Sequence, residues 1–251
     1  MFRRIKNKPL RYTVITTYSI MILLCAIQLN FLWLFGYSPT IQDIKMPNMH
    51  ISSEVYTADG KLIGKYYKEN RSPVLFSEIS PSVIDALVAT EDVRFFEHNG
   101  IDLHSLISSI ISTAKGDKRG ASTITQQLAK NLYSTRNQKS QGVIKYIPGV
   151  RTLFYKLKEW ITAYELEKYY SKQDILTLYL NTVPFGNNTY GIKTAAKLYF
   201  SKEPNKLQIE ESATLVGMLK ATTTYNPIKN PDKALGRRNV VLNQMHKYNY
   251  I

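Results

Sequence analysis

Cysteine is nearly absent from this chain, which has a single one, Cys25, in 251 residues. A lone thiol forms no disulfide within the chain, so the fold must be stabilised by its own core. Histidine is also scarce: His98 and His104 are six residues apart, and His50 and His246 are remote. No pair has the helical spacing of metal ligands, so we predict structural histidines and no metal site built from them.

Acidic residues are few, with 19 against 33 basic residues and a formal net charge of +14. Five basic residues fall in the first eleven positions, where no acid occurs: Arg3, Arg4, Lys6, Lys8 and Arg11. Taking these five from 33 leaves 28 basic residues against 19 acids, a formal charge of +9 for the rest. No DNA- or RNA-binding motif is present. We interpret the charge as attraction to anionic lipid and lipid diphosphate, with no nucleic-acid partner.

A charge-free run covers residues 12–35, directly after the basic segment. As a helix it spans about 36 Å, enough to cross a hydrocarbon core of about 30 Å. The positive-inside rule keeps the basic flank in the cytoplasm and places everything after Phe35 outside the cytoplasmic membrane. A cleaved signal peptide is the alternative, with small residues near Gly36, but the run is much longer than the usual apolar core of about 7–15 residues.

Four parts follow from this reading. They are a cytoplasmic basic tail (1–11), a transmembrane helix (12–35), a linker (36–52) and one exported domain (53–251). A hairpin is predicted at Asp59-Gly60, which lies between two short runs with β character. From Ser80 onward the pattern is helical almost throughout, and a capping box at 171–174 opens a further helix. The predicted fold class is therefore mainly α.

The most informative segment reads GASTITQQLAKN at residues 120–131. Wound as a helix, it places Ile124 and Leu128 on an apolar ridge. Polar side chains gather on the other side: Ser122, Gln126, Gln127, Lys130 and Asn131. Hydroxyls, amides and a lone cation are the groups that bind sugar hydroxyls and phosphate oxygens. An ordinary polar helix surface is the alternative for this segment taken alone.

Glu91 is the first candidate catalytic carboxylate. It continues the apolar stripe of Val83 and Leu87, which keeps it partly out of water and suits a general base acting near neutrality. Asp92 lies about 100° further round the helix and is expected to cap a helix or accept a hydrogen bond. The structural alternative for Glu91 is a buried acid that only caps a neighbouring helix.

Glu159 is the second candidate. It shares a helix face with Arg151, and Lys156 and Lys158 flank it in sequence. Basic neighbours favour an ionised carboxylate, so the two glutamates are expected to have different tasks. An ordinary solvated helix with exposed charge pairs is the alternative here.

Further segments complete an ordered set: EDVRFFEHNGID at 91–102, RTLFYKLKE at 151–159, ILTLYLN at 175–181, YGIKTAAKLYF at 190–200 and ESATL at 211–215. With residues 120–131 they closely resemble the motifs of the peptidoglycan glycosyltransferases, glycosyltransferase family 51. That family occurs alone or as the first catalytic domain of class A penicillin-binding proteins. The resemblance runs from about Ser53 to the end of the chain. The chain departs from the family at two positions. It has Tyr155 where the family usually has Arg, which removes one cation from the face expected to bind pyrophosphate. It also has Thr177 where the family often has Glu.

The resemblance implies a lysozyme-like helical lobe and a smaller lobe that dips into the membrane. A suitable apolar face for that smaller lobe comes from Leu103, Leu106, Ile107, Ile110 and Ile111.

The same resemblance implies polymerisation of lipid II by inverting glycosyl transfer, with release of undecaprenyl pyrophosphate. Glu91 would deprotonate the 4-hydroxyl of the acceptor sugar, and Glu159 would orient or stabilise the donor side. A divalent cation, Mg²⁺ or Mn²⁺, is left open as a cofactor. The implied partners are lipid II, the growing glycan chain, the cytoplasmic membrane and other proteins of cell-wall synthesis. The pyrophosphate would be neutralised by Lys130, Arg151, Lys158 and Arg238, and sugar and phosphate oxygens held by Ser122, Gln126, Gln127 and Asn131.

Three rival classes remain at this point. A penicillin-sensitive transpeptidase is suggested by STAK at 112–115, YLN at 179–181 and KTA at 193–195, but these fall in or between predicted helices and the strand that the last motif needs is missing. A lysozyme-like hydrolase also pairs carboxylates but needs neither a membrane helix nor so many cations. An inactive scaffold would not need Glu91 and Glu159. The hairpin resembles that of bifunctional relatives, so the chain is either a complete enzyme or the first part of a longer one.

Overall fold

The computed structural model describes residues 8–28, 37–47, 52–114, 120, 122–133, 146 and 150–251. Its first helix, α1 (Lys8–Gln28), contains a candidate membrane span at Lys8–Ala26 with a mean hydropathy of 1.3. The helix begins at Lys8, four residues before the predicted residue 12, so it also includes Lys8 and Arg11. Residues 29–35 of the predicted span lie outside the described residues.

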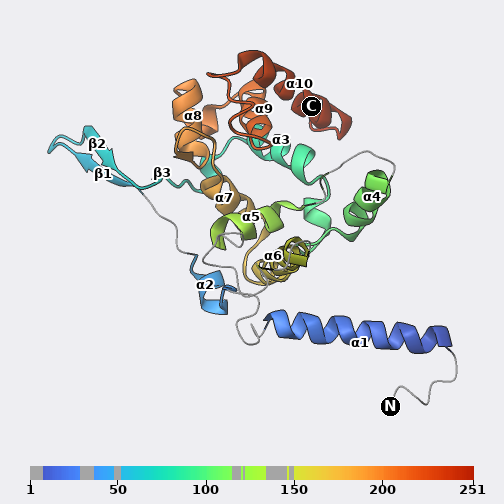
Figure 1. The fold of residues 1–251 in the computed structure, drawn as a ribbon. Helices are drawn as coiled ribbons and strands as arrows, with labels where there is room; N and C mark the ends of the chain where they lie inside the picture. Colours follow the sequence, from blue (N-terminus) through green and yellow to red (C-terminus); the bar gives the residue numbers. More distant parts are fainter. Residues whose placement is uncertain are drawn as a thin grey trace.

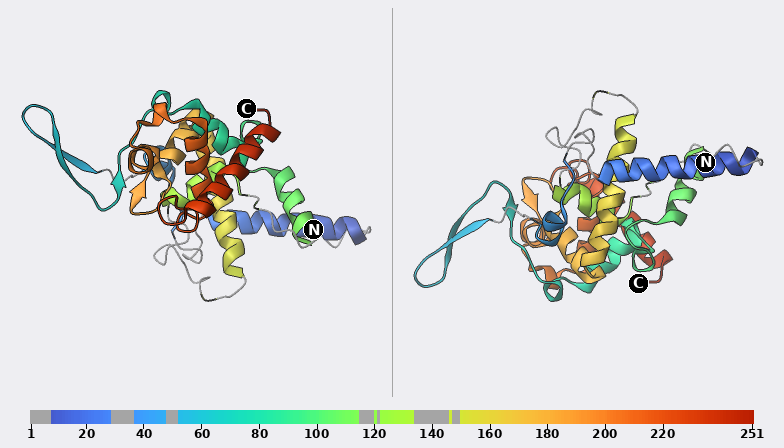
Figure 2. Two further views of the ribbon diagram at one scale, coloured as in Figure 1. Left: turned by 90° about the horizontal axis from the view of Figure 1, so that it is seen from above. Right: turned by 90° about the horizontal axis from the view of Figure 1, so that it is seen from below.

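A short helix and a hairpin follow. Helix α2 (Ile41–Lys45) begins at a capping box between Thr40 and Asp43. Strands β1 (Ser53–Tyr56) and β2 (Leu62–Tyr66) pair antiparallel, with Gly60 at φ +82° in the turn. The predicted hairpin is confirmed, and Figures 1 and 2 show it projecting from the helical body on the side away from α1.

The described residues after the hairpin form a mainly helical body, so the predicted class, mainly α, is confirmed. Its short 3₁₀ turns lie at Phe76–Glu78, Phe95–Glu97 and Pro204–Lys206. Its helices are α3 (Pro81–Glu91), α4 (Leu103–Ala114), α5 (Ile124–Tyr133), α6 (Val150–Tyr169), α7 (Lys172–Thr182), α8 (Ile192–Phe200), α9 (Ile209–Met218) and α10 (Pro231–Lys247).

Local signals explain several of these helix starts. The capping box predicted at 171–174 is present in α7, where the Ser171 hydroxyl accepts a hydrogen bond from the Asp174 amide. Prolines occupy the first turns of α3 and α10, where their missing amide hydrogen is no loss. Ser80 precedes α3 but does not cap it through its side chain, because its hydroxyl donates to the Leu207 carbonyl at 3.1 Å. That bond ties α3 to the segment before α9.

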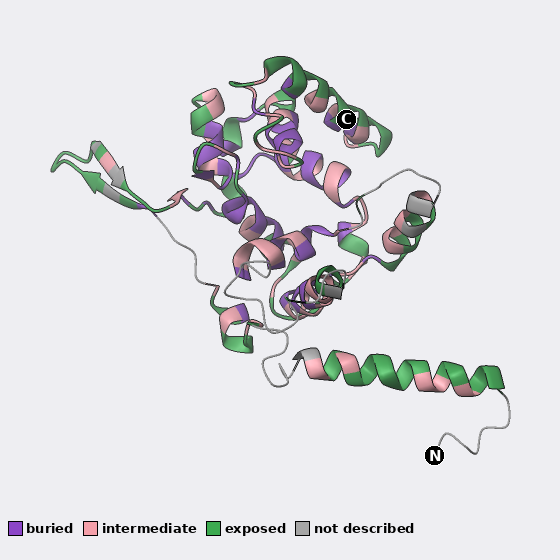
Figure 3. Cartoon of the chain, in the orientation of Figure 1, coloured by how far each residue is buried: buried purple, intermediate pink, exposed green. Residues whose placement is uncertain are grey.

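The core lies where α3 packs on α9 and α10, and where α5 packs on α6 and α7. Val83 and Leu87 of α3 and Ile124 and Leu128 of α5 are fully buried, which confirms both predicted apolar stripes. Figure 3 shows this buried interior in purple, with α1, α4 and the hairpin largely outside it. The apolar side chains of α4 at 103, 107 and 111 remain exposed on the surface.

A second, very small sheet was not predicted. Strands β3 (Asn70–Arg71) and β4 (Thr189–Tyr190) pair parallel across more than 100 residues of sequence. Strands of two residues are too short to show a period of alternation, so no pattern in the sequence indicates them.

Gly100 joins the turn after α3 to the start of α4 at a position that admits no side chain. Its φ is +83°, and a Cβ built there would lie 2.8 Å from the carbonyl oxygen of Ala163 in α6. The polypeptide at 98–102 therefore touches α6 through its backbone. Only glycine combines this φ with this close approach.

We expect Gly100→Ala to lower the free energy of unfolding by about 1–3 kcal/mol, because it adds a left-handed strain and a steric clash. Gly186→Ala is the matched control, since Gly186 has φ +79° but its nearest atom would lie 3.3 Å away. Thermal melting of both variants in detergent measures the difference. Equal losses in the two variants would contradict the close packing of Gly100 on α6.

Candidate active site

Glu91 ends α3 and lines an open cleft of about 140 Å³. Its side chain is half-buried, as the apolar stripe predicted. The cleft walls come from the end of α3, the start of α4, the segment before α5 and the last turns of α10. Besides Glu91, the polar residues lining it are Thr90, Asp92, Asp102, Ser105, Ser122, Thr123, Gln244 and Tyr248.

Gln127 of α5 holds the carboxylate of Glu91. Its Nε2 donates to Glu91 Oε2 at 2.8 Å, and its Oε1 accepts from the hydroxyl of Tyr179 at 3.0 Å. Tyr179 lies in α7 and is 1% exposed. The structure thus brings the predicted Glu91 and Gln127 together and adds Tyr179. Sequence reasoning singled out no tyrosine, although Tyr179 lies within ILTLYLN.

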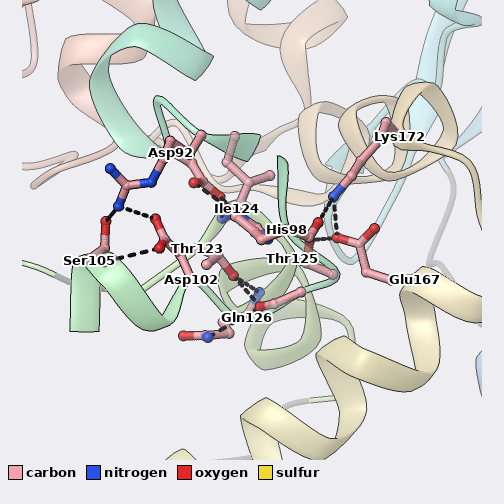
Figure 4. A network of polar contacts seen from close by, with 12 residues as sticks. Asp92, His98, Asp102, Ser105, Thr123, Ile124, Thr125, Gln126, Glu167 and Lys172 are labelled. Carbon is pink, nitrogen blue, oxygen red and sulfur yellow. Dashed lines mark hydrogen bonds and ion pairs between the residues drawn. The ribbon is translucent and has the colours of Figure 1, made fainter. Parts of the chain in front are cut away.

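Asp92 performs the capping role expected of it. It is 7% exposed, and its carboxylate accepts from the backbone amide of Ile124, the first residue of α5, at 3.0 Å. The same carboxylate lies 3.0 Å from Nε2 of His98. Figure 4 shows this pair at the centre of a polar network that joins the turn after α3 to α5. His98 thus has a structural role, as predicted.

Around this pair, two ionic clusters fix the neighbouring segments (Figure 4). Arg94 binds Asp102 at 2.8 Å and the Ser105 hydroxyl at 2.9 Å, which closes one wall of the cleft. Lys172 binds Glu167 at 2.9 Å and the carbonyl of His98 at 2.6 Å. Asp102 has a lowered pKa; burial opposes the lowering, while hydrogen bonds from Ser105 and Arg94 and the Arg94 charge favour the carboxylate.

Glu159 lies in the interior of α6 at 1% exposure. Lys156 forms an ion pair with its Oε2 at 3.0 Å and donates to the Ser122 hydroxyl at 2.6 Å. The basic neighbour expected to favour an ionised Glu159 is therefore in contact with it. Lys156 also bridges the motifs at 120–131 and 151–159, a contact that the sequence analysis did not predict. The hydroxyl of Tyr155 is buried and has no hydrogen-bond partner among the residues that the structure describes.

Two predicted binding residues point into the protein. Gln126 is 2% exposed and its Nε2 donates to the Gly100 carbonyl at 3.2 Å, so the expectation that it lies on an open polar face is wrong. The helical pattern misled here because α5 is packed on both sides, by α6 and by α7. Lys158 is also buried and donates to the carbonyl of Tyr37. Burial lowers the pKa of Lys158 to about 8.

The other predicted residues lie nearer the surface. Lys130 and Asn131 are partly exposed in the last turns of α5, and Arg151 is exposed in the first turn of α6. Arg238 donates to Asn239 on α10 and lies about 9 Å along the helix from Gln244, which lines the cleft. The end of α10 therefore lines the cleft, whereas Arg238 does not. Nothing in the local sequence pattern indicated Gln244 or Tyr248, because tertiary packing alone brings them there.

Neither a metal cluster nor a transpeptidase site is built from the described residues. Within the part of the chain that the structure covers, no three His, Cys, Asp or Glu side chains are placed to hold an ion. The transpeptidase-like segments lie on helices: Ser112 in α4, 179–181 in α7 and 193–195 in α8. Asn181 bonds to the backbone of Val74 through both ends of its amide. The described residues of these segments are helical, in agreement with the prediction that the segments lie in or between helices.

Known proteins resemble most of this chain. Penicillin-binding protein 1A of Escherichia coli (strain K12) is 38% identical over 215 residues, which cover 85% of this chain and 24% of that protein. Penicillin-binding protein 1F of Bacillus subtilis (strain 168) is 40% identical over 229 residues, with coverages of 88% and 30%. The chain therefore spans less than a third of the length of these relatives. A crystal structure of penicillin-binding protein 1A from Haemophilus influenzae is 27% identical, covers 81% of this chain and 19% of that one, and gives a TM-score of 0.43.

The family comparison covers the same region as the site. The model of the transglycosylase family matches residues 59–246, which include α3 to α9, most of α10 and all residues that line the Glu91 cleft except Tyr248. Together with the identities to the two penicillin-binding proteins, this match assigns the family. The chain belongs to the transglycosylase family.

Proposed function

We propose that this chain polymerises lipid II into peptidoglycan strands, with Glu91 as the general base. The observation that carries the proposal is the position of Glu91 in an open cleft with one carboxylate oxygen held by Gln127. A carboxylate in this setting can take the proton of a sugar hydroxyl placed in the cleft. Family membership supports cell-wall glycan synthesis as the setting.

The reaction balances as an inverting displacement. The 4-hydroxyl of the acceptor gives its proton to Glu91, and its oxygen forms a bond to the anomeric carbon of the donor. The bond from that carbon to the lipid diphosphate breaks on the opposite face, and undecaprenyl pyrophosphate leaves with the electron pair. Negative charge develops on the diphosphate, so positive groups fixed near it lower the barrier.

The donor side is assigned to the α5–α6 contact. Lys156 bridges Glu159 and Ser122, so this ammonium is already fixed by two partners next to the cleft. Lys130, Arg151 and Lys158 remain further candidates for the diphosphate, and Asn131 and Arg238 rest on the family resemblance alone. Glu159 is paired with the Lys156 ammonium, and the described residues contain no group of three or more His, Cys, Asp or Glu side chains that could hold an ion, so we assign no step to Mg²⁺ or Mn²⁺.

The setting of the reaction is the outer face of the cytoplasmic membrane. Helix α1 is long and apolar enough to anchor the chain, and its basic start favours a cytoplasmic N-terminus. Exposed Leu103, Ile107 and Ile111 give α4 an apolar side suited to the membrane surface. Lipid II and the nascent glycan strand are the proposed ligands.

The first test is Glu91→Gln in an assay of glycan formation from purified lipid II. Removing one general base lowers the rate by about 10²–10⁴-fold. Glu210→Gln changes an exposed glutamate in the first turn of α9 and should leave the rate unchanged. Wild-type polymerisation by the Glu91 variant would show that another group is the base.

The second test is the pH dependence of the rate on the alkaline side. Burial lowers the pKa of Lys158 to about 8, so its positive charge is present below that pH and is lost as the pH rises through it. If this charge assists the departing diphosphate, the rate falls above about pH 8. Lys158→Arg keeps the charge and should move the fall to higher pH, whereas Lys220→Arg, at an exposed position, should not. An alkaline limb that is unmoved in Lys158→Arg would remove Lys158 from the mechanism.

A further inference from the structure

Tyr179 is linked to the proposed base through a single amide. Its hydroxyl donates to Gln127 Oε1 at 3.0 Å, and Gln127 Nε2 donates to Glu91 Oε2 at 2.8 Å. Tyr179 is 1% exposed, so water does not replace the hydrogen bond of its hydroxyl. Burial, and then the negative charge of Glu91, hold the pKa of Tyr179 well above its ordinary value. The hydroxyl therefore keeps its proton and has one to donate.

A glutamine amide has a donor end and an acceptor end, and its function depends on which end faces which partner. With the Tyr179 hydroxyl donating to Oε1, the NH₂ end of Gln127 must face Glu91. In the opposite orientation a carbonyl oxygen would face the carboxylate, and two acceptors would meet without a proton between them. By donating to Oε1, the tyrosine therefore stabilises the orientation in which the NH₂ end of Gln127 faces the base.

We propose that Tyr179 is a positioning residue for catalysis, which fixes the orientation of Gln127 so that Glu91 Oε2 is held and Oε1 is left for the substrate proton. This inference rests on the proposed function of Glu91. Tyr179 comes from α7, which the proposed reaction does not otherwise use. Its role explains why a buried hydroxyl is placed in an otherwise apolar helix face beside Ile175, Leu176 and Leu180.

The other polar groups near Glu91 do not replace this arrangement. The Asp92 carboxylate is engaged by the Ile124 amide and by His98. Gln244 of α10 and Tyr248, directly after that helix, line the cleft, as do Ser122 and Thr123 from the segment before α5. Among the described residues, Gln127 is the one that donates a hydrogen bond to the Glu91 side chain.

Tyr179→Phe tests the proposal, because it keeps the buried ring and removes only the hydroxyl. We expect kcat to fall about tenfold, the effect of one lost hydrogen bond, with KM within about twofold of wild type. The acid limb of the pH–rate profile should move to higher pH, since a carboxylate that loses a donor is protonated more easily. Tyr199→Phe is the matched control: it removes a hydroxyl that donates to the Phe185 carbonyl at 2.8 Å, and both kcat and the acid limb should stay unchanged.

A double-mutant cycle with Gln127→Ala identifies the route of the effect. If Tyr179 acts through Gln127, adding Tyr179→Phe to Gln127→Ala causes no further loss, and Gln127→Ala alone moves the acid limb to higher pH. If Tyr179→Phe unfolds at the assay temperature, the acid limb of the Gln127→Ala profile still tests the proposal. It reports the loss of the hydrogen bond from Gln127 to Glu91.

Three outcomes overturn the proposal. They are a wild-type rate and acid limb in folded Tyr179→Phe, losses in the two single variants that multiply in the double variant, or an unmoved acid limb in Gln127→Ala. Each of these leaves the proposed function standing if the wild-type chain forms glycan strands from lipid II. A wild-type chain that forms none would refute both the function and the positioning role.

Discussion

The site depends on one hydrogen bond, in which the buried carboxylate of Asp92 accepts from the backbone amide of Ile124. A charge at 7% exposure is costly unless it is well satisfied, and here a helix N-terminus and His98 satisfy it. The contact fixes the end of α3 against the start of α5. Because Glu91 precedes Asp92 and Gln127 follows Ile124 by one turn of helix, the same contact sets the base beside its hydrogen-bond donor.

The segment directly before α5 joins the proposed acceptor and donor sides. Ser122 lines the cleft of Glu91 and also accepts from Lys156, which is paired with Glu159. The backbone of Gly100 adds a second connection, because its carbonyl accepts from Thr123 and Gln126. A shift of α5 would therefore alter both carboxylates together. The proposed mechanism needs this coupling, since proton removal and diphosphate departure occur in one displacement.

Local sequence patterns were sufficient to predict much of the secondary structure. The apolar stripes of α3 and α5, the hairpin at Gly60 and the capping box of α7 follow from local periodicity and turn chemistry, and the structure contains them all. Contacts between distant segments were not predictable in the same way. Tyr179, Gln244 and the inward turn of Gln126 depend on how α5, α7 and α10 pack. No period in a single helix records which of its polar residues meets another helix.

The most direct measurement is an experimental structure of the full chain carrying Glu91→Gln with lipid II bound in membrane mimetic. The account predicts an acceptor 4-hydroxyl within hydrogen-bond distance of the side chain at 91. It also predicts the donor diphosphate on the side of the cleft where Lys156 bridges Ser122 and Glu159. A sugar bound away from residue 91, or a diphosphate held on the opposite side of the body from Lys156, would contradict it.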